Sequence, residues 1–513
     1  MKQISRRELI AAGTGVAGFT FLPARVLGRG GATPPSEKLN LAFVGIGARG
    51  SFNLRELDHL NQNIVALCDV DWRARETTGR GGRAGRAGQD VLRLGEAERL
   101  SPILLTSKYY PQAKKYDDYR RMLEEQDKNI DGVVVATPDH LHAPVALAAM
   151  KMNKHVYVEK NMCRTIEEGR RMMAFAKKYK VTTQTGNQGH ASEDIRLIVE
   201  WFRDGLIGDV KLVHFFRGGT ASSPTPTGSG ELRVTYENVP KIVAEDHPVP
   251  ENLLWDLWLG PAKFRGYNPA YLPGRWRAWL DFGTGNPGDY LNHILDPVFW
   301  ALDLGYPNRV ESDPEEGYDW ATNKELYPWN GSMRWEFPAR GKMPPVEVYY
   351  HYGNHKATIP RPPGWREGTD QLYNTGGIMY GSKGAIVFGS IHASLPMTAS
   401  TGGYKPVPWG TPDKVLIFPP ELDKEYKRPA PTLPRVFNHW ADWVESAKAG
   451  KPAGSPFSYG GVMSEIALIG NAANAERGKI LEFDGKAGRF KNSNEANEMV
   501  VKRSYREGWA LPA

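Results

Sequence analysis

Short apolar runs recur through the first third of the chain and alternate with stretches of helical character. The apolar runs cover residues 39–45, 64–69, 130–136, 155–159 and 181–185. Helix-like stretches at 144–153 and 165–179 separate the later runs, and the second begins with Thr165 and Glu168 in the spacing of a capping box. Continuously apolar strands that alternate with helices are typical of a parallel sheet covered on both faces. The pattern predicts an α/β domain with a doubly wound, Rossmann-type parallel sheet over residues 36–186.

The pattern changes after residue 186, where aromatic residues become frequent. Apolar and polar residues alternate at 346–352, and Pro/Gly-rich loops separate the segments. Because alternation is typical of strands buried on one face, we expect a second, α+β domain with a mostly antiparallel sheet over residues 187–480, and a tail at 481–513. Closing helices are expected at 434–448 and 461–477. Long loops at 218–250 and 390–433 are candidates for lids or oligomer contacts, and 77–107 is interpreted as an insertion.

The N-terminus has the layout of an export signal. Arg6 and Arg7 precede an apolar tract at 9–23, and small residues follow it. We therefore expect a cleaved twin-arginine signal at residues 1–32, and a periplasmic or extracellular protein that engages the twin-arginine export machinery. A buried N-terminal helix is the alternative. Because the sequence has no uninterrupted apolar run of about 18 residues, stable membrane insertion is not expected.

The composition is that of an ordinary globular protein, with 41% hydrophobic and 24% charged residues. The net charge of +7 is raised by the signal and by an Arg/Gly-rich stretch at 73–99. Because this stretch has no interleaved aromatic residues, we interpret it as a solvated loop and expect no nucleic-acid partner. Cys68 and Cys163 could form one disulfide, but two buried free thiols are favoured. No metal site is expected.

A glycine turn directly follows the first apolar run. Gly45, Gly47 and Gly50 have the spacing of a dinucleotide-binding turn, with Ile46 and Arg49 between them. Glycines permit the tight turn and let the backbone approach a pyrophosphate at the N-terminus of the following helix. The turn therefore predicts a dinucleotide cofactor.

The second apolar run ends in a carboxylate that bears on the choice of dinucleotide. Asp69, with Asp71 close behind, is placed to accept hydrogen bonds from the hydroxyls of the adenosine ribose. A carboxylate there repels a 2′-phosphate, so NAD is favoured. Because Arg73 and Arg75 could neutralise such a phosphate, NADP is kept as the alternative.

Export and a dinucleotide cofactor together constrain the chemistry. An exported enzyme has no free nicotinamide pool to draw on, and a chain threaded unfolded through a pore would lose its cofactor. The twin-arginine route exports folded proteins, so we expect a nucleotide that is loaded before export, tightly held and recycled in place.

Three further motifs accompany the glycine turn. They are Ala136-Thr-Pro-Asp-His-Leu-His142, Val156-Tyr-Val-Glu-Lys160 and Gly288-Asp-Tyr-Leu-Asn-His-Ile-Leu-Asp296. Together the motifs resemble the Gfo/Idh/MocA oxidoreductases, whose members act mainly on sugars, cyclitols and related polyols. The resemblance runs from about Lys38 to the segment that begins at Ser458. The family usually has proline after the motif lysine, where this chain has Asn161, which leaves the backbone geometry beside Lys160 to be determined.

Catalytic candidates follow from position and from the resemblance. Lys160 ends an apolar run, and doubly wound sheets bind their ligands at the carboxyl ends of strands. Helical spacing places Asp289, His293 and Asp296 along one face of a helix. The resemblance implies that His293 is the leading general acid/base, that Lys160 assists and that Asp289 positions the substrate or the histidine. Asp296 is as much a structural candidate as a chemical one.

The remaining site predictions form two sets. The expected cofactor-binding residues are Gly45, Ile46, Gly47, Arg49, Gly50, Asp69, Thr137, Pro138, His142, Glu159 and Lys160, and the resemblance places His140 near the nicotinamide ribose as well. The tentative substrate contacts are Asn187, Gln188, His190 and Trp276. Of the tryptophans at 255, 258, 276 and 279, most are expected in the core and one or two in the cleft.

The resulting hypothesis is an NAD-dependent oxidoreductase that acts on a sugar or glycoside with a tightly bound, internally recycled cofactor. One alternative is an NAD-dependent glycoside hydrolase or lyase that works by oxidation and elimination, an exception to the paired-carboxylate scheme. Net oxidation with an unknown electron acceptor is another. A non-catalytic exported carbohydrate-binding protein is the alternative from a different class. We also expect a homo-oligomer.

Overall fold

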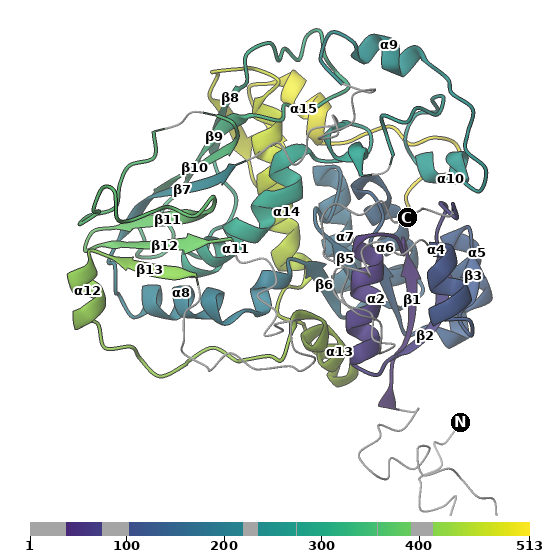
Figure 1. Cartoon of the computed structure of the whole chain (residues 1–513), viewed down its shortest axis with the longest axis horizontal. Coiled ribbons are helices and arrows are strands. Elements are labelled where there is room, and N and C mark those ends of the chain that lie inside the picture. Colours follow the sequence, from purple (N-terminus) through teal and green to yellow (C-terminus); the bar gives the residue numbers. More distant parts are fainter. Residues whose placement is uncertain (1–36, 74–101, 219–233, 273, 356–357, 391–413) are drawn as a thin grey trace, which may run out of the picture.

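The apolar runs of the first domain become a six-stranded parallel sheet (Figure 1). The computed structural model describes residues 37–73, 102–218, 234–272, 274–355, 358–390 and 414–513. The strands are β1 (Asn40–Val44), β2 (Asn63–Cys68), β3 (Lys114–Tyr116), β4 (Gly132–Val135), β5 (His155–Glu159) and β6 (Thr183–Gly186). Their order in the sheet is β3-β2-β1-β4-β5-β6, and all neighbouring pairs are parallel. Because the order reverses between β1 and β4, a ligand crevice is expected at that point.

Helices cover both faces of this sheet, as predicted. The main ones are α2 (Arg49–His59), α5 (Tyr119–Glu125), α6 (His142–Lys151) and α7 (Ile166–Tyr179), and shorter turns are α4 (Pro102–Leu104), η3 (Leu105–Tyr109), η4 (Asp127–Asn129) and η5 (Asp139–Leu141). The capping box of α7 is confirmed: the Glu168 N–H donates to Thr165 Oγ1 at 3.3 Å, and the Thr165 N–H donates to Glu168 Oε2 at 3.2 Å. The predicted doubly wound architecture is therefore correct.

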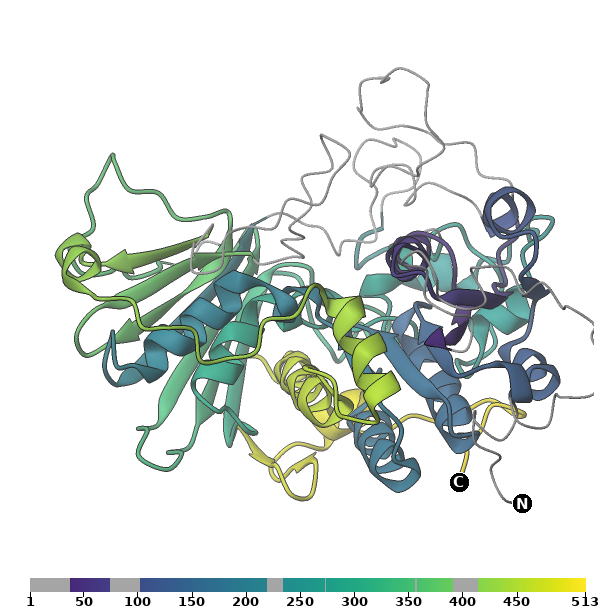
Figure 2. The same ribbon diagram turned by 90° about the horizontal axis from the view of Figure 1, so that it is seen from below.

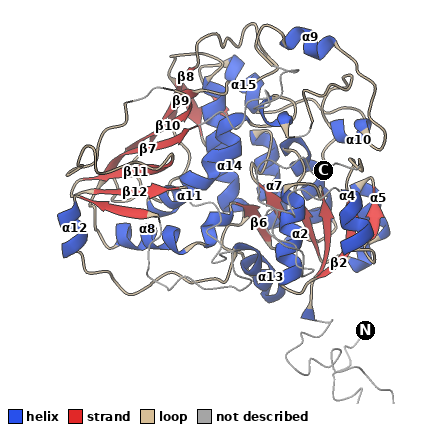
Figure 3. Cartoon of the chain, in the orientation of Figure 1, coloured by secondary structure: helices blue, strands red, loops and turns tan. Residues whose placement is uncertain are grey.

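The second domain is built on a nine-stranded mixed sheet (Figure 3). Its strands are β7 (Val210–Gly218), β8 (Arg309–Pro314), β9 (Gly331–Phe337), β10 (Val346–Gly353), β11 (Thr375–Gly381), β12 (Ala385–Gly389), β13 (Val415–Phe418), β14 (Leu481–Asp484) and β15 (Arg489–Phe490). The order is β13-β12-β11-β7-β10-β9-β8-β14-β15, in which β7 and β10 run parallel and the other pairs antiparallel. Burial alternates along β9 and β10, so one face of the sheet packs on the core.

Helices α11 (Asn292–Ala301) and α14 (Phe457–Ala473) lie between the two sheets, and the other helices of this part of the chain surround them (Figures 1 and 2). The longer ones are α8 (Glu193–Arg203), α11 (Asn292–Ala301), α14 (Phe457–Ala473) and α15 (Asn494–Val500), and the shorter elements are η6 (Gln188–Ala191), α9 (Val239–Ala244), α10 (Trp255–Leu259), η7 (Arg275–Ala278), η8 (Pro287–Leu291) and α12 (Pro420–Glu425). Helix α14 contacts α7 of the first domain and β8 of the second. One hydrophobic core therefore runs through both domains.

The chain returns to the first domain near its C-terminus. Helix α13 (His439–Ala449) begins later than predicted, because the Asn438 side chain caps it by accepting from the Ala441 N–H at 2.7 Å. Trp440 and Trp443 on α13 are fully buried in the same cluster as Leu41 of β1. Residues 481–513, expected as a tail, add β14, β15 and α15. A helix from the end of the chain thus completes the core of the nucleotide-binding domain.

Several sequence predictions lie partly or wholly outside the described residues. The expected signal at 1–32 and the Arg/Gly-rich stretch from 74 onward lie outside them, as do parts of the two long loops. Cys68 and Cys163 are both buried and free, as favoured. None of the helices in the described ranges is long and apolar enough to span a membrane.

Candidate active site

A cavity of about 400 Å³ lies at the carboxyl ends of the parallel strands, where the strand order reverses. Its floor comes from the ends of β1, β2, β4 and β5, and its opposite wall comes from the second domain and from Trp509 near the C-terminus. Ten of the residues predicted for the site line it: Gly45, Gly47, Arg49, Asp69, Thr137, Pro138, Glu159, Lys160, Trp276 and Asp289. The cavity therefore brings together most of the residues that the sequence motifs predicted for the cofactor and for catalysis.

The glycine turn has the shape that a dinucleotide needs. Gly45 has φ of 80°, and a Cβ there would stand 2.8 Å from the Ala136 carbonyl group. A Cβ on Gly50 would lie 1.9 Å from the Gly45 carbonyl oxygen, so this position admits only glycine. A Cβ on Gly47 would meet no atom within 4 Å, because this residue borders the open cavity. Helix α2 follows with no side chain capping its N-terminus, which leaves its N–H groups available to a pyrophosphate.

Asp69 links the turn to the ribose end of the cavity. Its Oδ2 accepts from the Ile46 N–H at 2.8 Å, and its Oδ1 accepts from the Val70 and Asp71 N–H groups at 2.8 and 3.0 Å. Oδ2, which accepts only one of these bonds, keeps capacity for a further donor such as a ribose hydroxyl. Ile46 thus serves through its backbone, since its side chain is buried.

Arg73 is engaged by a carboxylate and is not free to bind a phosphate. Its Nε and Nη2 donate to the two oxygens of Asp71 at 2.7 and 2.8 Å. This bidentate pair compensates the charge of Arg73, an arginine close behind Asp69 that could otherwise have bound the 2′-phosphate of NADP. Arg75 lies outside the described residues. The ribose end of the site fits NAD.

At the other end of the cavity, Lys160 meets Asp289 across the two domains. Lys160 Nζ donates to Asp289 Oδ1 at 2.6 Å and also to the Asp289 backbone carbonyl. Arg277 Nε donates to the same Oδ1 at 3.1 Å, and a terminal nitrogen of Arg217 lies 4.0 Å from Oδ2. Three cations therefore surround one carboxylate.

The charge on Asp289 is fixed by these neighbours. Burial disfavours the ionised carboxylate, but Lys160, Arg277 and Arg217 outweigh that penalty and hold the pKa of Asp289 well below its ordinary value of 3.8. Asp289 is thus a permanent anion that positions Lys160 and does not itself exchange protons near neutral pH. Asp289 was predicted to position the substrate or the histidine, and in the structure the side chain that it positions is Lys160.

His293 lies one turn further along, away from the cavity wall. It is 1% exposed, in the first turn of α11, and its ring packs edge-on to Tyr290 with centroids 5.8 Å apart. The π-helical turn η8 precedes α11, and Asp289 and Asp296 have entirely different partners. Asp289 therefore belongs to the cavity and Asp296 to a separate network, which agrees with the structural one of the two roles left open for Asp296.

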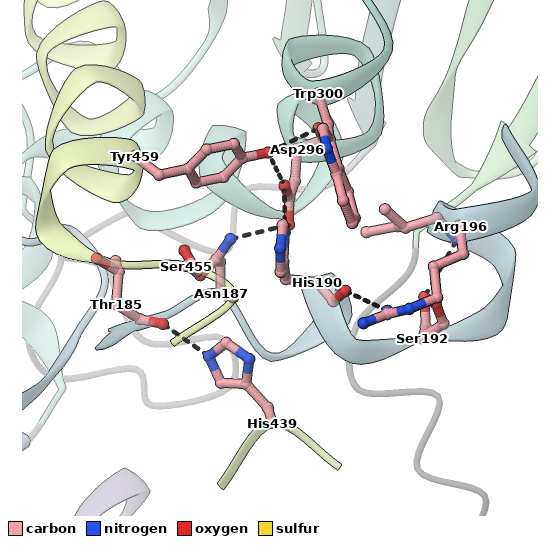
Figure 4. Close-up of polar contacts among 12 residues, drawn as sticks. Thr185, Asn187, His190, Ser192, Arg196, Asp296, Trp300, His439, Ser455 and Tyr459 are labelled. Atoms are coloured by element: carbon pink, nitrogen blue, oxygen red, sulfur yellow. Dashed lines mark hydrogen bonds and ion pairs between the residues drawn. The ribbon is translucent and has the colours of Figure 1, made fainter. Parts of the chain in front are cut away.

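Asp296 is the centre of a buried polar network (Figure 4). It accepts from Asn187 Nδ2 at 2.8 Å and from the Tyr459 hydroxyl at 2.5 Å, and His190 Nδ1 lies 2.9 Å away. The His190 ring stacks on Trp300 with centroids 4.6 Å apart. Asn187 and His190 therefore join β6 to α11 and do not line the cavity. Their predicted substrate contact is not supported by this placement.

Two other predicted residues, Gln188 and His142, lie directly behind the cavity wall. Gln188 Nε2 donates to Glu159 Oε1 at 2.7 Å and to the Tyr157 hydroxyl at 2.9 Å, so it orients a residue that does line the cavity. The ring nitrogens of His142 lie 2.7 Å from the Asn161 carbonyl and 2.9 Å from the Thr137 carbonyl. His142 thus fastens the loops after β4 and β5 to each other.

His140 is enclosed by the second domain. Its ring nitrogens lie 3.3 Å from the Phe282 carbonyl and 3.0 Å from the Trp258 carbonyl. Burial lowers the pKa of His140 to about 3, so its ring is neutral. The histidine secures the interface between the domains and is not on the cavity wall.

Asn161 replaces the family proline without loss of the lysine's placement. The Lys160–Asn161 peptide bond is cis. Asn161 Nδ2 donates to the Cys163 carbonyl at 2.9 Å, and its Oδ1 accepts from Asn292 Nδ2 at 3.1 Å. These bonds tie the end of β5 to the start of α11, so Lys160 and Asp289 are held from both sides.

Several cavity residues were not predicted from the sequence. Arg277 and Trp509 line the cavity, and Arg217 stands behind Asp289 with its guanidinium 3.7 Å from the centre of the Tyr290 ring. None of them belongs to a motif. Trp258 and Trp276 are the cavity tryptophans of the four considered, while Trp255 and Trp279 are core. In the described part of the chain, no cluster of three or more His, Cys, Asp or Glu residues could hold a metal.

Comparison with known proteins agrees with this geometry. Residues 39–187 match the model of the Gfo/Idh/MocA oxidoreductase family, NAD-binding Rossmann fold, and residues 230–324 match the C-terminal alpha/beta domain of the same family. A glycosyl hydrolase family 109 protein from Stenotrophomonas maltophilia is 31% identical over 225 residues, which are 42% of this chain and 42% of that protein. The chain thus aligns with less than half of the length of this curated relative.

Solved structures share the fold. An aldose-aldose oxidoreductase from Caulobacter crescentus in complex with glycerol gives a TM-score of 0.51 at 15% identity, covering 87% of this chain and 100% of that one. The WlbA dehydrogenase from Bordetella pertussis, in complex with NADH and UDP-GlcNAcA, gives 0.51 at 14% identity, covering 87% and 99%. At these identities the likeness concerns the fold alone.

The fold and the cavity define a protein with an NAD-binding Rossmann domain and an α/β partner domain. Residues 39–187 and 230–324 are similar to the two domains of the Gfo/Idh/MocA oxidoreductase family.

Proposed function

We propose that this chain is an exported NAD-dependent oxidoreductase that acts on a sugar or glycoside and keeps its NAD throughout the catalytic cycle. The observation that carries the proposal is the Lys160–Asp289 pair, which lies at the end of the cavity opposite the ribose-binding Asp69. A bound NAD would supply a hydride acceptor at that end. A lysine held there by a permanent anion is suited to bind a substrate hydroxyl.

Two residues of the chain have separate proposed roles in the oxidation of the substrate alcohol. Lys160 Nζ has a third N–H beyond the two that bond to Asp289, and this N–H would donate a hydrogen bond to the oxygen of the reacting hydroxyl. This bond stabilises the negative charge that develops on the oxygen as the C–H bond breaks. The resemblance alone proposes His293 as the acceptor of the hydroxyl proton, because His293 is buried behind the cavity wall in this structure. Two electrons and the hydrogen leave the carbon together as hydride.

The fit of NAD rests on features of the turn and of its neighbours. The open space at Gly47, the uncapped N-terminus of α2 and the Thr137 hydroxyl, which has no hydrogen-bond partner within the described ranges, all border the cavity or its rim. Pairing of Arg73 with Asp71 removes the cation that NADP would need. NAD is therefore the proposed cofactor.

Export leads to the proposal of internal recycling. Arg6 and Arg7 support a twin-arginine signal and a periplasmic or extracellular location. Outside the cytoplasm the reduced cofactor must be reoxidised in place, and a second carbonyl compound that accepts the hydride and a proton would do so. We also propose that the folded protein is a homo-oligomer, which sedimentation analysis would test.

A second candidate function is glycoside hydrolysis by oxidation, elimination, addition of water and return of the hydride. The specific support is the curated relative from Stenotrophomonas maltophilia, which is named as a glycosyl hydrolase family 109 protein. In this scheme Lys160 and Asp289 keep the same tasks, because the ketone formed first is what acidifies the neighbouring C–H bond.

The experiment is a substrate panel run without added nucleotide. Purified protein is mixed with sugars, to follow absorbance at 340 nm, and with aryl glycosides, to follow phenol release. Lys160→Met should abolish either signal. Lys154→Met is the matched control, because Lys154 flanks the other end of β5 and has its own ion pair with Asp127 at 2.9 Å. Equal signals from the Lys160 variant and the wild type would refute the proposed role.

A further inference from the structure

We propose that the C-terminal segment 503–511 is part of the nucleotide site: Trp509 forms the wall against the adenine base, and the segment is a fixed strap that slows NAD release. NAD binding itself follows from the family. The retention that the strap would provide deepens the proposed function and rests on it.

Trp509 is placed in the cavity by contacts with both domains. It lines the cavity and is 7% exposed. Its ring lies 6.3 Å from the Tyr119 ring, centre to centre, and the Arg120 guanidinium sits 4.3 Å from its centre. A Cβ on Gly260 would lie 3.5 Å from Cζ3 at the edge of the indole. The ring is therefore held between α5 of the first domain and the end of α10.

The first anchor of the segment is Arg503. This arginine is buried, and its Nε donates to Glu168 Oε1 at 2.8 Å, while Nη2 donates to the His140 carbonyl at 2.6 Å. The Tyr505 hydroxyl donates to the same Glu168 oxygen at 2.9 Å. Glu168 belongs to the capping box at the start of α7, so these bonds attach the C-terminal segment to a helix of the nucleotide domain.

The second anchor joins the segment to the loop after α10. Arg506 Nε donates to the Gly260 carbonyl at 3.0 Å, and Nη2 donates to the Asp256 carbonyl at 2.8 Å. Arg120 Nη1 donates to the Gly508 carbonyl at 3.2 Å, and the Trp509 N–H donates to the Arg506 carbonyl at 3.0 Å. The residues before and after Trp509 are thus fixed, and Leu511 is buried beyond it.

The position of Trp509 along the cavity assigns it to the adenine. The nicotinamide end lies at Lys160, after β5, and the pyrophosphate end lies at the glycine turn, after β1. Asp69, after β2, receives the adenosine ribose. Trp509 packs on Tyr119, just after β3, which is the next strand outward. The base extends beyond its ribose in that direction, where the indole can stack on it.

The route of the chain agrees with this assignment. Figure 1 shows the yellow C-terminal trace leaving α15, passing α10 and ending beside the helices of the nucleotide domain. The strap therefore crosses from the second domain to the first at the adenine end of the cavity.

The test compares nucleotide affinity in three full-length variants stripped of NAD and refilled. Trp509→Ala should weaken NAD binding about 5- to 150-fold, the range found when an aromatic ring stacked on a base is truncated. Trp509→Phe should stay within about threefold of wild type, because it keeps a ring. Trp365→Ala is the matched control: Trp365 also has an arginine at 4.9 Å and an aromatic neighbour, but does not line the cavity.

Fragments of the cofactor locate the effect. Trp509→Ala should lose affinity for AMP as much as for NAD, and should bind nicotinamide mononucleotide like the wild type. Unchanged AMP and NAD affinity in a folded Trp509→Ala protein would overturn the proposal, as would an equal loss for nicotinamide mononucleotide. If Trp509→Ala does not fold, Arg506→Ala, which removes the second anchor alone, should raise the NAD dissociation rate.

Retention is measured separately, as the NAD remaining after gel filtration. Loss of NAD from the wild type would count against internal recycling but would leave the affinity comparison intact. Retention that is equal in the wild type and in Trp509→Ala would count against the strap alone. The two proposals can therefore fail independently.

Discussion

Lys160 Nζ lies 2.6 Å from Asp289 Oδ1, and the two residues come from different domains. Lys160 ends a strand of the parallel sheet, whereas Asp289 lies in the turn that leads into α11. The ion pair therefore closes the cavity at the same point where the domains meet. The proposed reaction at Lys160 and the packing of the two domains therefore both depend on the Lys160–Asp289 ion pair.

Asp289→Asn should separate these two effects. The amide keeps the shape of the side chain but cannot hold the Lys160 ammonium by charge, so we expect kcat to fall by at least about 100-fold. NAD affinity should change by less than about twofold, because Asp289 is far from the glycine turn. Asp281→Asn is the control, since Asp281 pairs with Arg265 and does not line the cavity. A kcat within about threefold of wild type would contradict the assigned role.

The same pair predicts how stability changes with acid. The pKa of Asp289 is lower in the folded protein than the ordinary 3.8, so its contribution to stability is present above that value and is lost as the pH falls through the folded pKa. At pH 7 the wild type should exceed Asp289→Asn by about 3 kcal/mol. Urea unfolding at intervals from pH 7 to 3 should show the gap closing only below about pH 4. A gap that grows in acid would contradict the ionised state.

Asp71→Asn should change the choice of dinucleotide. Arg73 is compensated by Asp71 in the structure, and removing that charge frees a guanidinium beside the ribose-binding Asp69. The ratio of the NADP to the NAD dissociation constant should fall about tenfold, an effect of about 1.4 kcal/mol. Fluorescence titration of stripped protein with each nucleotide measures it. An unchanged ratio would mean that Arg73 is not what excludes NADP.

Trp443→Ala should destabilise the nucleotide domain. Trp443 lies more than 250 residues after β6, the last strand of that domain, but it packs against the sheet. The ring is fully buried against the sheet, and a Cβ on Gly132 would come within 3.1 Å of it. Truncation should cost about 3–5 kcal/mol of unfolding free energy. For the same reason, a fragment of residues 37–186 should not fold alone. Urea denaturation with Trp365→Ala as the control tests the first statement, and a folded fragment would disprove the second.

The first domain was predictable because its signals are local. The apolar run at 155–159 is β5 itself, and Lys160 therefore falls at the strand end where a ligand is expected. The glycine turn and Thr165 likewise specify their own geometry through steric limits and capping. Strand β3 was missed because its three residues carry two exposed lysines and no apolar run.

The rest of the site depends on contacts between distant segments. Arg217 reaches Asp289 from β7, and Trp509 reaches the cavity from the C-terminal segment. Nothing near either residue in the sequence marks it. His190 was a tentative substrate contact, but α11 places Asp296 beside it, and the buried hydrogen bond between them arises only when distant segments pack together. Helical spacing alone could not show that Asp296 belongs to that network.

The nucleotide content of the exported protein decides most directly between a retained and an exchangeable cofactor. The full-length chain would be expressed with its N-terminus intact, recovered from the periplasm, passed through gel filtration and analysed by mass spectrometry after denaturation. We predict about one NAD per chain, with little NADP, and reduction of that bound NAD by at least one sugar or glycoside. Periplasmic protein that is folded, competent to bind added NAD and yet free of nucleotide would contradict a cofactor carried out and recycled in place.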